Sequence, residues 1–211
     1  MCLSRIDVAI LCGGKGTRIA HLLGDTPKVL APINGRPYLD YLVAKLKRLN
    51  ARSIVLCTGH LPEKIIRWSK GRDDVMLSPE FEPSGTAGAV KNAASFLLSD
   101  PVLIINGDTL STIDLCVFTE AYYGTPLTAI AYIYESGGEL EYAGHYLLSR
   151  DALRDLEKGV FTDLAVFFRH LQLSRHAAAY QMGGDCYLDI GSPEDYRKAA
   201  RFVKEFHIDY Q

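Results

Sequence analysis

A glycine-rich segment with two nearby cations has the composition of a phosphate-binding loop. Residues 11–18 read Leu-Cys-Gly-Gly-Lys-Gly-Thr-Arg and follow an apolar run, residues 6–12, that is typical of a buried strand. Backbone N–H groups of such a loop can approach phosphate oxygens closely. Arg18 can bind a phosphate through two N–H groups, and Lys28 adds a compact positive charge. We therefore expect a phosphate site formed by Leu11, Gly13, Gly14, Gly16, Thr17, Arg18 and Lys28.

Two common nucleotide motifs do not fit this loop. The Walker A motif places Ser or Thr directly after its lysine, but Lys15 is followed by glycine. The dinucleotide motif GxGxxG needs a glycine at the position of Ile19. A tight strand-to-helix turn with surface cations is the alternative interpretation, and the combination of glycines with Thr17, Arg18 and Lys28 favours phosphate binding over it.

Two aspartates follow strand-like runs. Asp108 comes after a buried run at residues 102–106, and Asp189 ends a short run at residues 187–189. Ligands of open α/β sheets bind beyond the carboxyl ends of the strands. Mg²⁺ prefers one or two carboxylates together with phosphate oxygens and water. We therefore expect Asp108 and Asp189 to bind Mg²⁺, while either aspartate alone would fit a turn or a helix cap.

Apolar runs alternate with helical patterns along the first half of the chain. Strands are expected at residues 6–12, 53–58, 75–77 and 102–106. Helices are expected at residues 37–49, 62–70 and 86–98, and a fourth is expected to reach Tyr123 from a capping box of Ser111 and Asp114. This alternation predicts an α/β fold, namely a Rossmann-like three-layer sandwich with a mixed, mainly parallel central sheet.

The second half of the chain predicts further strands and helices of the same sheet. Strands are expected at residues 127–134 and 142–148 around Gly137 and Gly138, and at residues 177–182 and 187–189. Helices are expected at residues 151–158 and 163–173, and after a cap at Ser192. No linker separates the two halves, so residues 1–211 are expected to form a single domain.

Composition excludes several classes of protein. A chain of 211 residues with 48% hydrophobic side chains and a net charge of −2 is typical of a soluble domain without affinity for nucleic acid or membranes. Its longest apolar run, residues 129–134, is far shorter than the roughly 20 residues that span a bilayer. Five cysteines without a CxxC pair predict reduced thiols and a cytoplasmic location. The histidines show no zinc spacing, and His145 is expected at the surface.

The motifs resemble those of the sugar-1-phosphate nucleotidyltransferases. In that family the loop Leu-x-Gly-Gly-x-Gly-Thr-Arg is followed by Pro-Lys, as at residues 11–18 and 27–28. Residues 31–38 and 187–196 are most similar to the D-glycero-D-manno-heptose 1-phosphate guanylyltransferases, and the resemblance covers nearly the whole chain. This resemblance implies that an NTP and a sugar 1-phosphate react to form an NDP-sugar and pyrophosphate, with GTP and heptose 1-phosphate as the favoured substrates.

The resemblance also implies site residues. Residues 82–89 resemble the family's base-binding segment, which includes Thr86 and in which Gly85 and Gly88 would leave a flat slot for the base. Close packing at a helix start also explains the two glycines. Glu82 accepts hydrogen bonds when it is ionised, which suits the donor edge of guanine. Because the reaction brings two polyanions together, Arg18 and Lys28 are the expected catalytic cations.

One region departs from the family pattern. After residue 134 the family's Glu-Lys-Pro is missing, and residues 142–144 read Tyr-Ala-Gly in place of Asn-Ala-Gly. The alternatives are a CTP- or UTP-dependent transferase for another phosphorylated acceptor, and a non-catalytic nucleotide-binding regulatory protein. A retaining glycosyltransferase is disfavoured because residues 106–108 do not form Asp-x-Asp. Apart from the two substrates, the expected partner is a second copy, with the apolar stretch 161–168 as a candidate homodimer contact.

Overall fold

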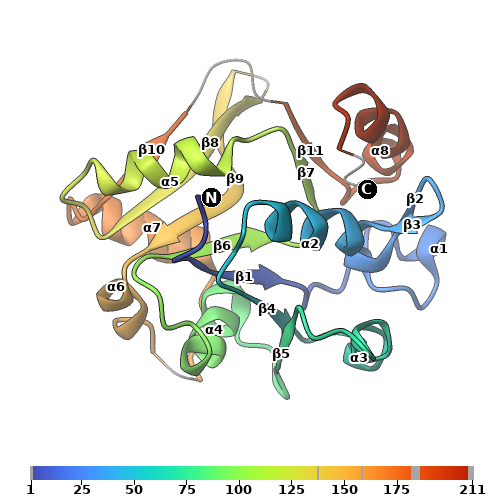
Figure 1. Ribbon diagram of the computed structural model, residues 1–211, viewed down its shortest axis with the longest axis horizontal. Helices are drawn as coiled ribbons and strands as arrows, with labels where there is room; N and C mark the ends of the chain where they lie inside the picture. Colours follow the sequence, from blue (N-terminus) through green and yellow to red (C-terminus); the bar gives the residue numbers. More distant parts are fainter. Residues whose placement is uncertain (1, 137, 158, 182–185, 209–211) are drawn as a thin grey trace.

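A seven-stranded sheet runs through the centre of the molecule (Figure 1). The computed structural model describes residues 2–136, 138–157, 159–181 and 186–208. In spatial order the strands are β10 (Ala177–Tyr180), β8 (Ala129–Ser136), β9 (Glu139–Leu148), β6 (Val102–Asn106), β1 (Asp7–Leu11), β4 (Ser53–Thr58) and β5 (Met76–Pro79). β6, β1, β4 and β5 are parallel, β9 is antiparallel to β6 and β8, and β10 is parallel to β8. The predicted mixed, mainly parallel sheet is therefore confirmed.

Helices cover both faces of the sheet and bury a separate apolar core on each (Figure 1). One core includes side chains of α2 (Tyr38–Arg48), α3 (Pro62–Ser69), α5 (Leu115–Tyr123) and α8 (Pro193–Glu205). The other includes side chains of α4 (Gly85–Asn92), α6 (Arg150–Arg154) and α7 (Leu164–Leu173). The short elements are α1 (Ala20–Leu23), η1 (Lys28–Leu30) and η2 (Ala93–Ser95). These layers are the predicted three-layer sandwich.

Two short ribbons lie beside the main sheet. β7 (Thr109–Ser111) pairs antiparallel with β11 (Tyr187–Asp189), and β2 (Pro32–Ile33) pairs antiparallel with β3 (Arg36–Pro37). β7 follows directly after β6, whereas β11 arrives from the far end of the chain. The β7–β11 ribbon therefore joins segments that are distant in sequence at the edge where β6 ends (Figure 1).

Most predicted elements have close to their predicted bounds. Residues 53–58, 102–106 and 187–189 are strands as predicted, and the Ser192 hydroxyl caps α8 by accepting the Asp195 N–H at 3.0 Å. The helix predicted at residues 151–158 is wrong beyond Arg154, where α6 ends. Some predicted positions, Gly137, Lys158 and Met182, lie outside the described residues.

The predicted capping box before α5 is half correct. Asp114 is the cap, because its Oδ1 accepts the backbone N–H groups of Cys116 at 2.8 Å and Val117 at 3.2 Å. Ser111 does not take part, since it lies within β7 and its hydroxyl is hydrogen-bonded to His145. A spacing of three residues therefore placed the helix start correctly but assigned the wrong partner to the cap.

The prediction of five reduced thiols is wrong for one pair. Cys2 and Cys116 form a disulfide, with their Cα atoms 5.3 Å apart. The N-terminal segment reaches α5 because Leu3 is fully buried in the core and its N–H donates to Leu49. Spacing rules compare neighbouring cysteines and do not detect a pair separated by 114 residues. Cys12 and Cys57 are buried free thiols, and burial raises the pKa of both.

Asp7 interrupts the apolar strand β1 because its buried carboxylate connects three segments. Oδ2 accepts hydrogen bonds from Arg52 Nη1 at 2.7 Å and from the N–H groups of Leu98 at 2.6 Å and Ser99 at 2.8 Å. Oδ1 accepts the Ser53 hydroxyl at 2.6 Å. These bonds fix the amino ends of β1 and β4 to the segment that precedes β6. The amino ends of the three strands are therefore held together.

No helix among the residues that the structure describes is long and apolar enough to cross a bilayer.

Candidate active site

The glycine loop lies against the turn after β4 with its backbone exposed to one side. A Cβ at Gly13 would lie 3.2 Å from Gly59 N, and the His60 N–H donates to Gly13 O at 3.2 Å. On the other flank the Gly107 N–H donates to Leu11 O at 3.0 Å. This close packing of loop against loop favours glycine at position 13, and a φ of +59° favours it at position 16, whereas a Cβ at Gly14 would meet no neighbouring atom. The loop emerges at the carboxyl end of β1, as the sequence predicted.

Lys28 lies between two carboxylates. Its Nζ donates to Asp108 Oδ2 at 2.6 Å and to Asp189 Oδ1 at 3.0 Å. The Lys28 side chain is only 9% exposed, whereas the two carboxylates are about one third exposed. Arg18 adds a second cation, with Nη2 at 3.6 Å from Asp189 Oδ2, and its side chain extends into solvent. The predicted catalytic cations and metal ligands therefore form one cluster.

The β7–β11 ribbon brings this cluster together. Asp189 pairs with Thr109 in the ribbon, and the Ile190 N–H donates to Asp108 O at 3.0 Å. Gly191 then passes so close that a Cβ there would lie 2.7 Å from Lys28 Nζ. The sequence separation of the two aspartates is large, and only the ribbon pairing places them on opposite sides of one ammonium group.

A cleft of about 540 Å³ opens beside the cluster. Its walls come from the glycine loop, the turn after β4, the segment before α4, the end of β6 and the segment before α7. The lining residues are Leu11, Gly13, Gly14, Lys15, Gly59, His60, Glu80, Phe81, Pro83, Ser84, Gly85, Thr86, Ala89, Asn106, Asp108, Phe161 and Asp163. Asp108 belongs to both the cleft and the charge cluster, so a ligand in the cleft can reach the cations.

The segment before α7 covers the start of α4. The Thr162 N–H donates to Ser84 O at 2.9 Å, and the Leu164 N–H donates to Thr86 Oγ1 at 2.7 Å. Gly85 has a φ of +76°, and a Cβ there would collide with the Thr162 backbone. Glycine is therefore required at position 85 by backbone conformation and by close packing.

Most of the predicted site residues meet at this place. The residues that line the cleft are Leu11, Gly13, Gly14, Gly85, Thr86 and Asp108. Arg18, Lys28 and Asp189 form the cluster at its edge, and Gly16, with a φ of +59°, lies against the Lys28 side chain.

Four predicted binding residues do not line the cleft, namely Gly16, described above, and three others. Thr17 and Glu82 are exposed outside it. Gly88 is buried inside α4, where a Cβ would press against the Ser84 side chain at 2.5 Å, so its role is helix packing. The resemblance implied that the missing side chain at position 88 leaves a slot for the base, but Gly88 does not line the cleft.

Several lining residues were missed by the sequence analysis. Glu80, two positions before Glu82, enters the cleft because its N–H donates to Thr58 O at 2.8 Å and Ser84 donates a hydrogen bond to its carboxylate. Gly59 and Asn106 directly follow or end strands β4 and β6. The rule that predicted Asp108, namely ligand sites at the carboxyl ends of parallel strands, would also have found these two.

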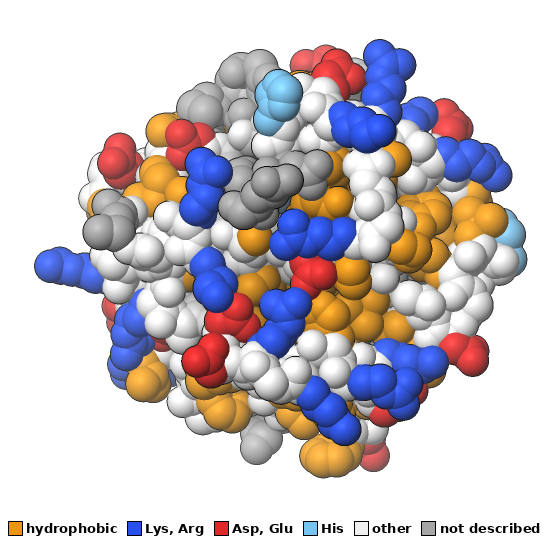
Figure 2. Space-filling model, turned by 45° about the vertical axis from the view of Figure 1, so that its right-hand side comes forward, with side chains coloured by type: hydrophobic (Ala, Val, Ile, Leu, Met, Phe, Trp, Pro, Cys, Tyr) orange, Lys and Arg blue, Asp and Glu red, His pale blue; other side chains and the backbone are white. Residues whose placement is uncertain are grey.

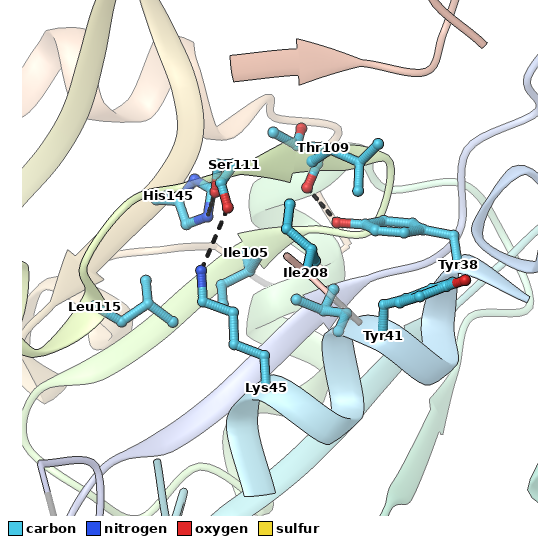
Figure 3. Close-up of a pocket in the computed structure, with 11 residues that line it drawn as sticks. Tyr38, Tyr41, Lys45, Ile105, Thr109, Ser111, Leu115, His145 and Ile208 are labelled. Carbon is cyan, nitrogen blue, oxygen red and sulfur yellow. Dashed lines mark hydrogen bonds between the residues drawn. The ribbon is translucent and has the colours of Figure 1, made fainter. Parts of the chain in front are cut away.

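A layer of polar side chains packs against β7 (Figure 3). The Tyr38 hydroxyl donates to Thr109 O, and Lys45 Nζ donates to Ile113 O at 3.1 Å and points to Ser111 O. These groups line a cavity of only about 20 Å³. The layer holds the strand that follows Asp108, so it contributes to the position of the charge cluster without contacting it.

His145 belongs to this layer, which corrects its predicted surface position. It is 2% exposed because β9 lies inside the sheet, where Nε2 is 3.3 Å from Ser111 Oγ and Nδ1 is 2.7 Å from Ala143 O. Desolvation, with a smaller effect of the Lys45 charge, lowers the pKa of His145 to about 3. The folded protein therefore requires the neutral imidazole.

Stability should consequently fall in acid partly through His145. The imidazole takes up a proton near pH 6.5 in the unfolded chain but only near 3 in the fold, so its contribution is complete above pH 6.5 and declines as the pH falls toward 3. Between pH 6 and 4, urea unfolding of the native chain should lose about 1.4 kcal/mol per pH unit more than unfolding of His145→Gln. Parallel pH curves for the two proteins would contradict this assignment.

On the face shown in Figure 2, Lys and Arg side chains surround acidic side chains near the centre, and apolar surface lies beside them. Cations with exposed carboxylates beside a glycine-lined cleft match a ligand that carries several phosphates and a divalent cation. Within the residues that the structure describes, no group of three or more His, Cys, Asp or Glu side chains is arranged to bind a metal by itself.

Fold and site together define an α/β protein of the doubly wound class with a glycine-lined cleft at the carboxyl ends of its strands. A family model for MobA-like NTP transferase domains matches residues 8–173, and the chain belongs to this family. The predicted class of enzyme, a nucleotidyltransferase, is thereby confirmed.

Relatives of known name agree with this assignment. A D-glycero-alpha-D-manno-heptose 1-phosphate guanylyltransferase from Campylobacter jejuni is 30% identical, over 90% of this chain and 97% of the relative. A protein of the same name from Aneurinibacillus thermoaerophilus is 29% identical, over 95% of this chain and all of the relative. The crystal structure of HddC from Yersinia pseudotuberculosis complexed with GMP-PN superposes with a TM-score of 0.78 at 27% identity, over 93% of this chain and 98% of that one.

Proposed function

We propose that this protein transfers a guanylyl group from GTP to a sugar 1-phosphate, with heptose 1-phosphate as the preferred acceptor. The products are a GDP-sugar and pyrophosphate. The observation that carries the proposal is the meeting of Lys28, Asp108 and Asp189 at the edge of a cleft lined by the glycine loop. The names of the relatives from Campylobacter jejuni and Aneurinibacillus thermoaerophilus support the acceptor and the guanylyl group.

The loop and its cations would hold the triphosphate. Gly13, Gly14 and Lys15 line the cleft, and Arg18 lies at its edge with most of its side chain exposed. Exposure leaves the guanidinium free to turn from Asp189 to a phosphate, to which it can donate two hydrogen bonds.

The chemical step would be an in-line substitution at the α-phosphorus. An oxygen of the sugar 1-phosphate forms the new P–O bond, and the bond to the β-phosphate breaks with its electron pair going to pyrophosphate. The attacking oxygen is already an anion, so no general base is required. The main barrier is repulsion between polyanions, and Lys28 would lower it by placing its ammonium group beside the reacting phosphates.

Mg²⁺ would complete the charge balance. Asp108 and Asp189 already share a cation, the Lys28 ammonium, which shows that their oxygens converge on a positive charge. Two carboxylates with space for phosphate oxygens and water are the ligands that Mg²⁺ prefers. When bound there, the ion would supply positive charge to the phosphates of both substrates.

Glu80 would read the base. An ionised carboxylate only accepts hydrogen bonds, and guanine presents neighbouring N–H donors, whereas uracil and thymine also present acceptors. Glu80 lies in the cleft beside the loop, because a Cβ at Gly13 would be 3.4 Å from its Oε2. This assigns to Glu80 the role that the sequence analysis gave to Glu82.

Pyrophosphate release from a matrix of four NTPs and several sugar 1-phosphates with Mg²⁺ tests the proposed function. The highest rate is expected for GTP with heptose 1-phosphate. Absence of release from every pair, together with tight nucleotide binding, would instead indicate a regulatory protein.

Substitution of Glu80 should weaken the preference for guanine. In Glu80→Gln an amide N–H₂ replaces one acceptor oxygen, so kcat/KM for GTP should fall by about 10- to 100-fold, while that for CTP or UTP changes little. Glu82→Gln is the matched control, because Glu82 is exposed outside the cleft. Equal effects of the two substitutions would show that Glu80 does not recognise the base.

A further inference from the structure

Two phenylalanine rings at the cleft have no packing that explains them. Phe81 is 97% exposed and Phe161 is 66% exposed, and both line the cleft. Exposed apolar side chains are common singly, but a pair at the walls of one concave site favours a ligand with an apolar face.

The backbone on either side of each ring is fixed. Phe81 follows Glu80, whose N–H donates to Thr58 O at 2.8 Å and whose carboxylate accepts a hydrogen bond from Ser84. Phe161 precedes Thr162, whose N–H donates to Ser84 O at 2.9 Å. Phe81 therefore belongs to the segment that precedes α4, and Phe161 belongs to the segment that precedes α7, which is hydrogen-bonded to it. Their exposure is not the result of a loop without contacts.

We propose that Phe81 and Phe161 hold the nucleobase by stacking on its ring faces. The assignment rests on the proposed function, which places the triphosphate at the glycine loop and the base toward Glu80. An aromatic ring stacks on any base, so the two phenylalanines provide affinity that does not depend on the base, while Glu80 provides the selection of guanine. The ligand class is thus a purine or pyrimidine nucleoside triphosphate, bound more tightly than its base-free analogue.

A subunit contact is the competing explanation for the exposed rings. Other exposed apolar side chains, Val166 at 65% and Leu173 at 81%, lie on α7 and do not line the cleft. Phe161 belongs to the stretch 161–168, the candidate homodimer contact, but unlike Val166 and Leu173 it lines the cleft. The common position of Phe81 and Phe161 at the cleft favours the nucleobase.

Direct binding of two ligands tests the proposal. Calorimetry would compare GTP with ribose 5-triphosphate, which keeps the sugar and phosphates but has no base. Phe81→Leu and Phe161→Leu keep an apolar side chain and remove the aromatic face. Phe96→Leu is the matched control, because Phe96 is 41% exposed and does not line the cleft. Sedimentation velocity of each protein would report the state of assembly.

The expected result distinguishes the contribution of the base to binding from that of the phosphates. Each cleft variant should bind GTP about tenfold more weakly, a loss within the range for aromatic stacking on a base, and ribose 5-triphosphate within twofold of native. The Phe96→Leu protein should bind both ligands as the native chain does. Unchanged affinity for GTP, equal losses for both ligands, or a smaller assembly with unchanged GTP affinity would each overturn the proposal.

A tryptophan reporter gives a second measurement. Trp68 is the only natural tryptophan and is held in α3 by a hydrogen bond to Asp40, so it supplies a constant background. In Phe81→Trp, GTP should quench the new fluorescence and ribose 5-triphosphate should not. A native chain that releases pyrophosphate but binds both ligands equally would disprove the stacking and leave the proposed function intact. A native chain that binds neither ligand would disprove the proposed function itself.

Discussion

Replacement of Lys28 by methionine should lower kcat by about 100- to 1,000-fold, as expected for loss of one preorganised charge at a reacting centre. The methionine stem has a similar length, so the change removes the charge more than the packing. The glycine loop and the cleft remain, so KM for GTP should rise much less than kcat falls. Steady-state measurement of pyrophosphate release gives both parameters.

Lys47→Met is the matched control for this experiment. Lys47 also forms an ion pair, with Asp74 Oδ2 at 2.8 Å, but it lies on the exposed side of α2 and its side chain is 56% exposed. Its loss should leave kcat unchanged. A Lys28→Met protein with native kcat would show that the cluster has no part in the reaction.

Lys28→Met also tests, without any measurement of turnover, whether Asp108 and Asp189 bind a divalent cation. Because the ammonium lies between Asp108 and Asp189, its removal leaves two carboxylates that face one space. Manganese(II), used as a paramagnetic probe in the absence of nucleotide, should bind Lys28→Met more tightly than the native chain. Loss of this binding in Lys28→Met/Asp108→Asn would assign it to the aspartates, and its persistence would assign the probe elsewhere.

Of the substitutions proposed for this protein, replacement of Asp7 by alanine should cause the largest loss of unfolding free energy. In Asp7→Ala the Arg52 guanidinium, the Ser53 hydroxyl and the N–H groups of Leu98 and Ser99 lose their common acceptor inside the protein. Breaking a buried charged network from one side costs about 3 to 5 kcal/mol of unfolding free energy. Urea unfolding at neutral pH measures this quantity.

Two further variants make the Asp7 prediction specific. Asp7→Asn keeps an acceptor at the position of Oδ2, which receives most of the hydrogen bonds, so about half of the stability should be retained. Asp151→Ala removes an exposed carboxylate paired with Arg154 and should change the unfolding free energy by less than about 0.5 kcal/mol. A loss below 1 kcal/mol in Asp7→Ala would mean that water replaces the carboxylate, despite its burial.

Local sequence signals were sufficient for much of the fold. Apolar runs with turn residues at both ends predicted β4, β6 and β11 with their observed bounds, because buried strands need continuous apolar side chains. The alternation of strands and helices then predicted the layers. Asp7 could not be explained in this way, since its partners come from Arg52, Ser53 and the segment before β6.

The chemistry of the site was also present in the sequence, but not all of its members. Glycine spacing with Arg18 and Lys28 identified the loop, because backbone approach to phosphate restricts residue type locally. Glu82 was predicted and Glu80 was not, since the hydrogen bonds that turn Glu80 inward cannot be deduced from the sequence. Phe161 was predicted only as part of a homodimer contact and Phe81 was not predicted at all, because exposure of a ring at a cleft is a property of the surface.

By itself, then, the sequence determined the layered α/β architecture and the glycine loop, which depend on neighbours along the chain, and its motifs indicated the class of enzyme through their resemblance to a known family. Only the tertiary structure decided that Asp108 and Asp189 share one ammonium group, that Cys2 meets Cys116, and that His145 is buried. Each of these is a contact across the fold, fixed by strand pairing and core packing between segments that local residue preferences do not relate.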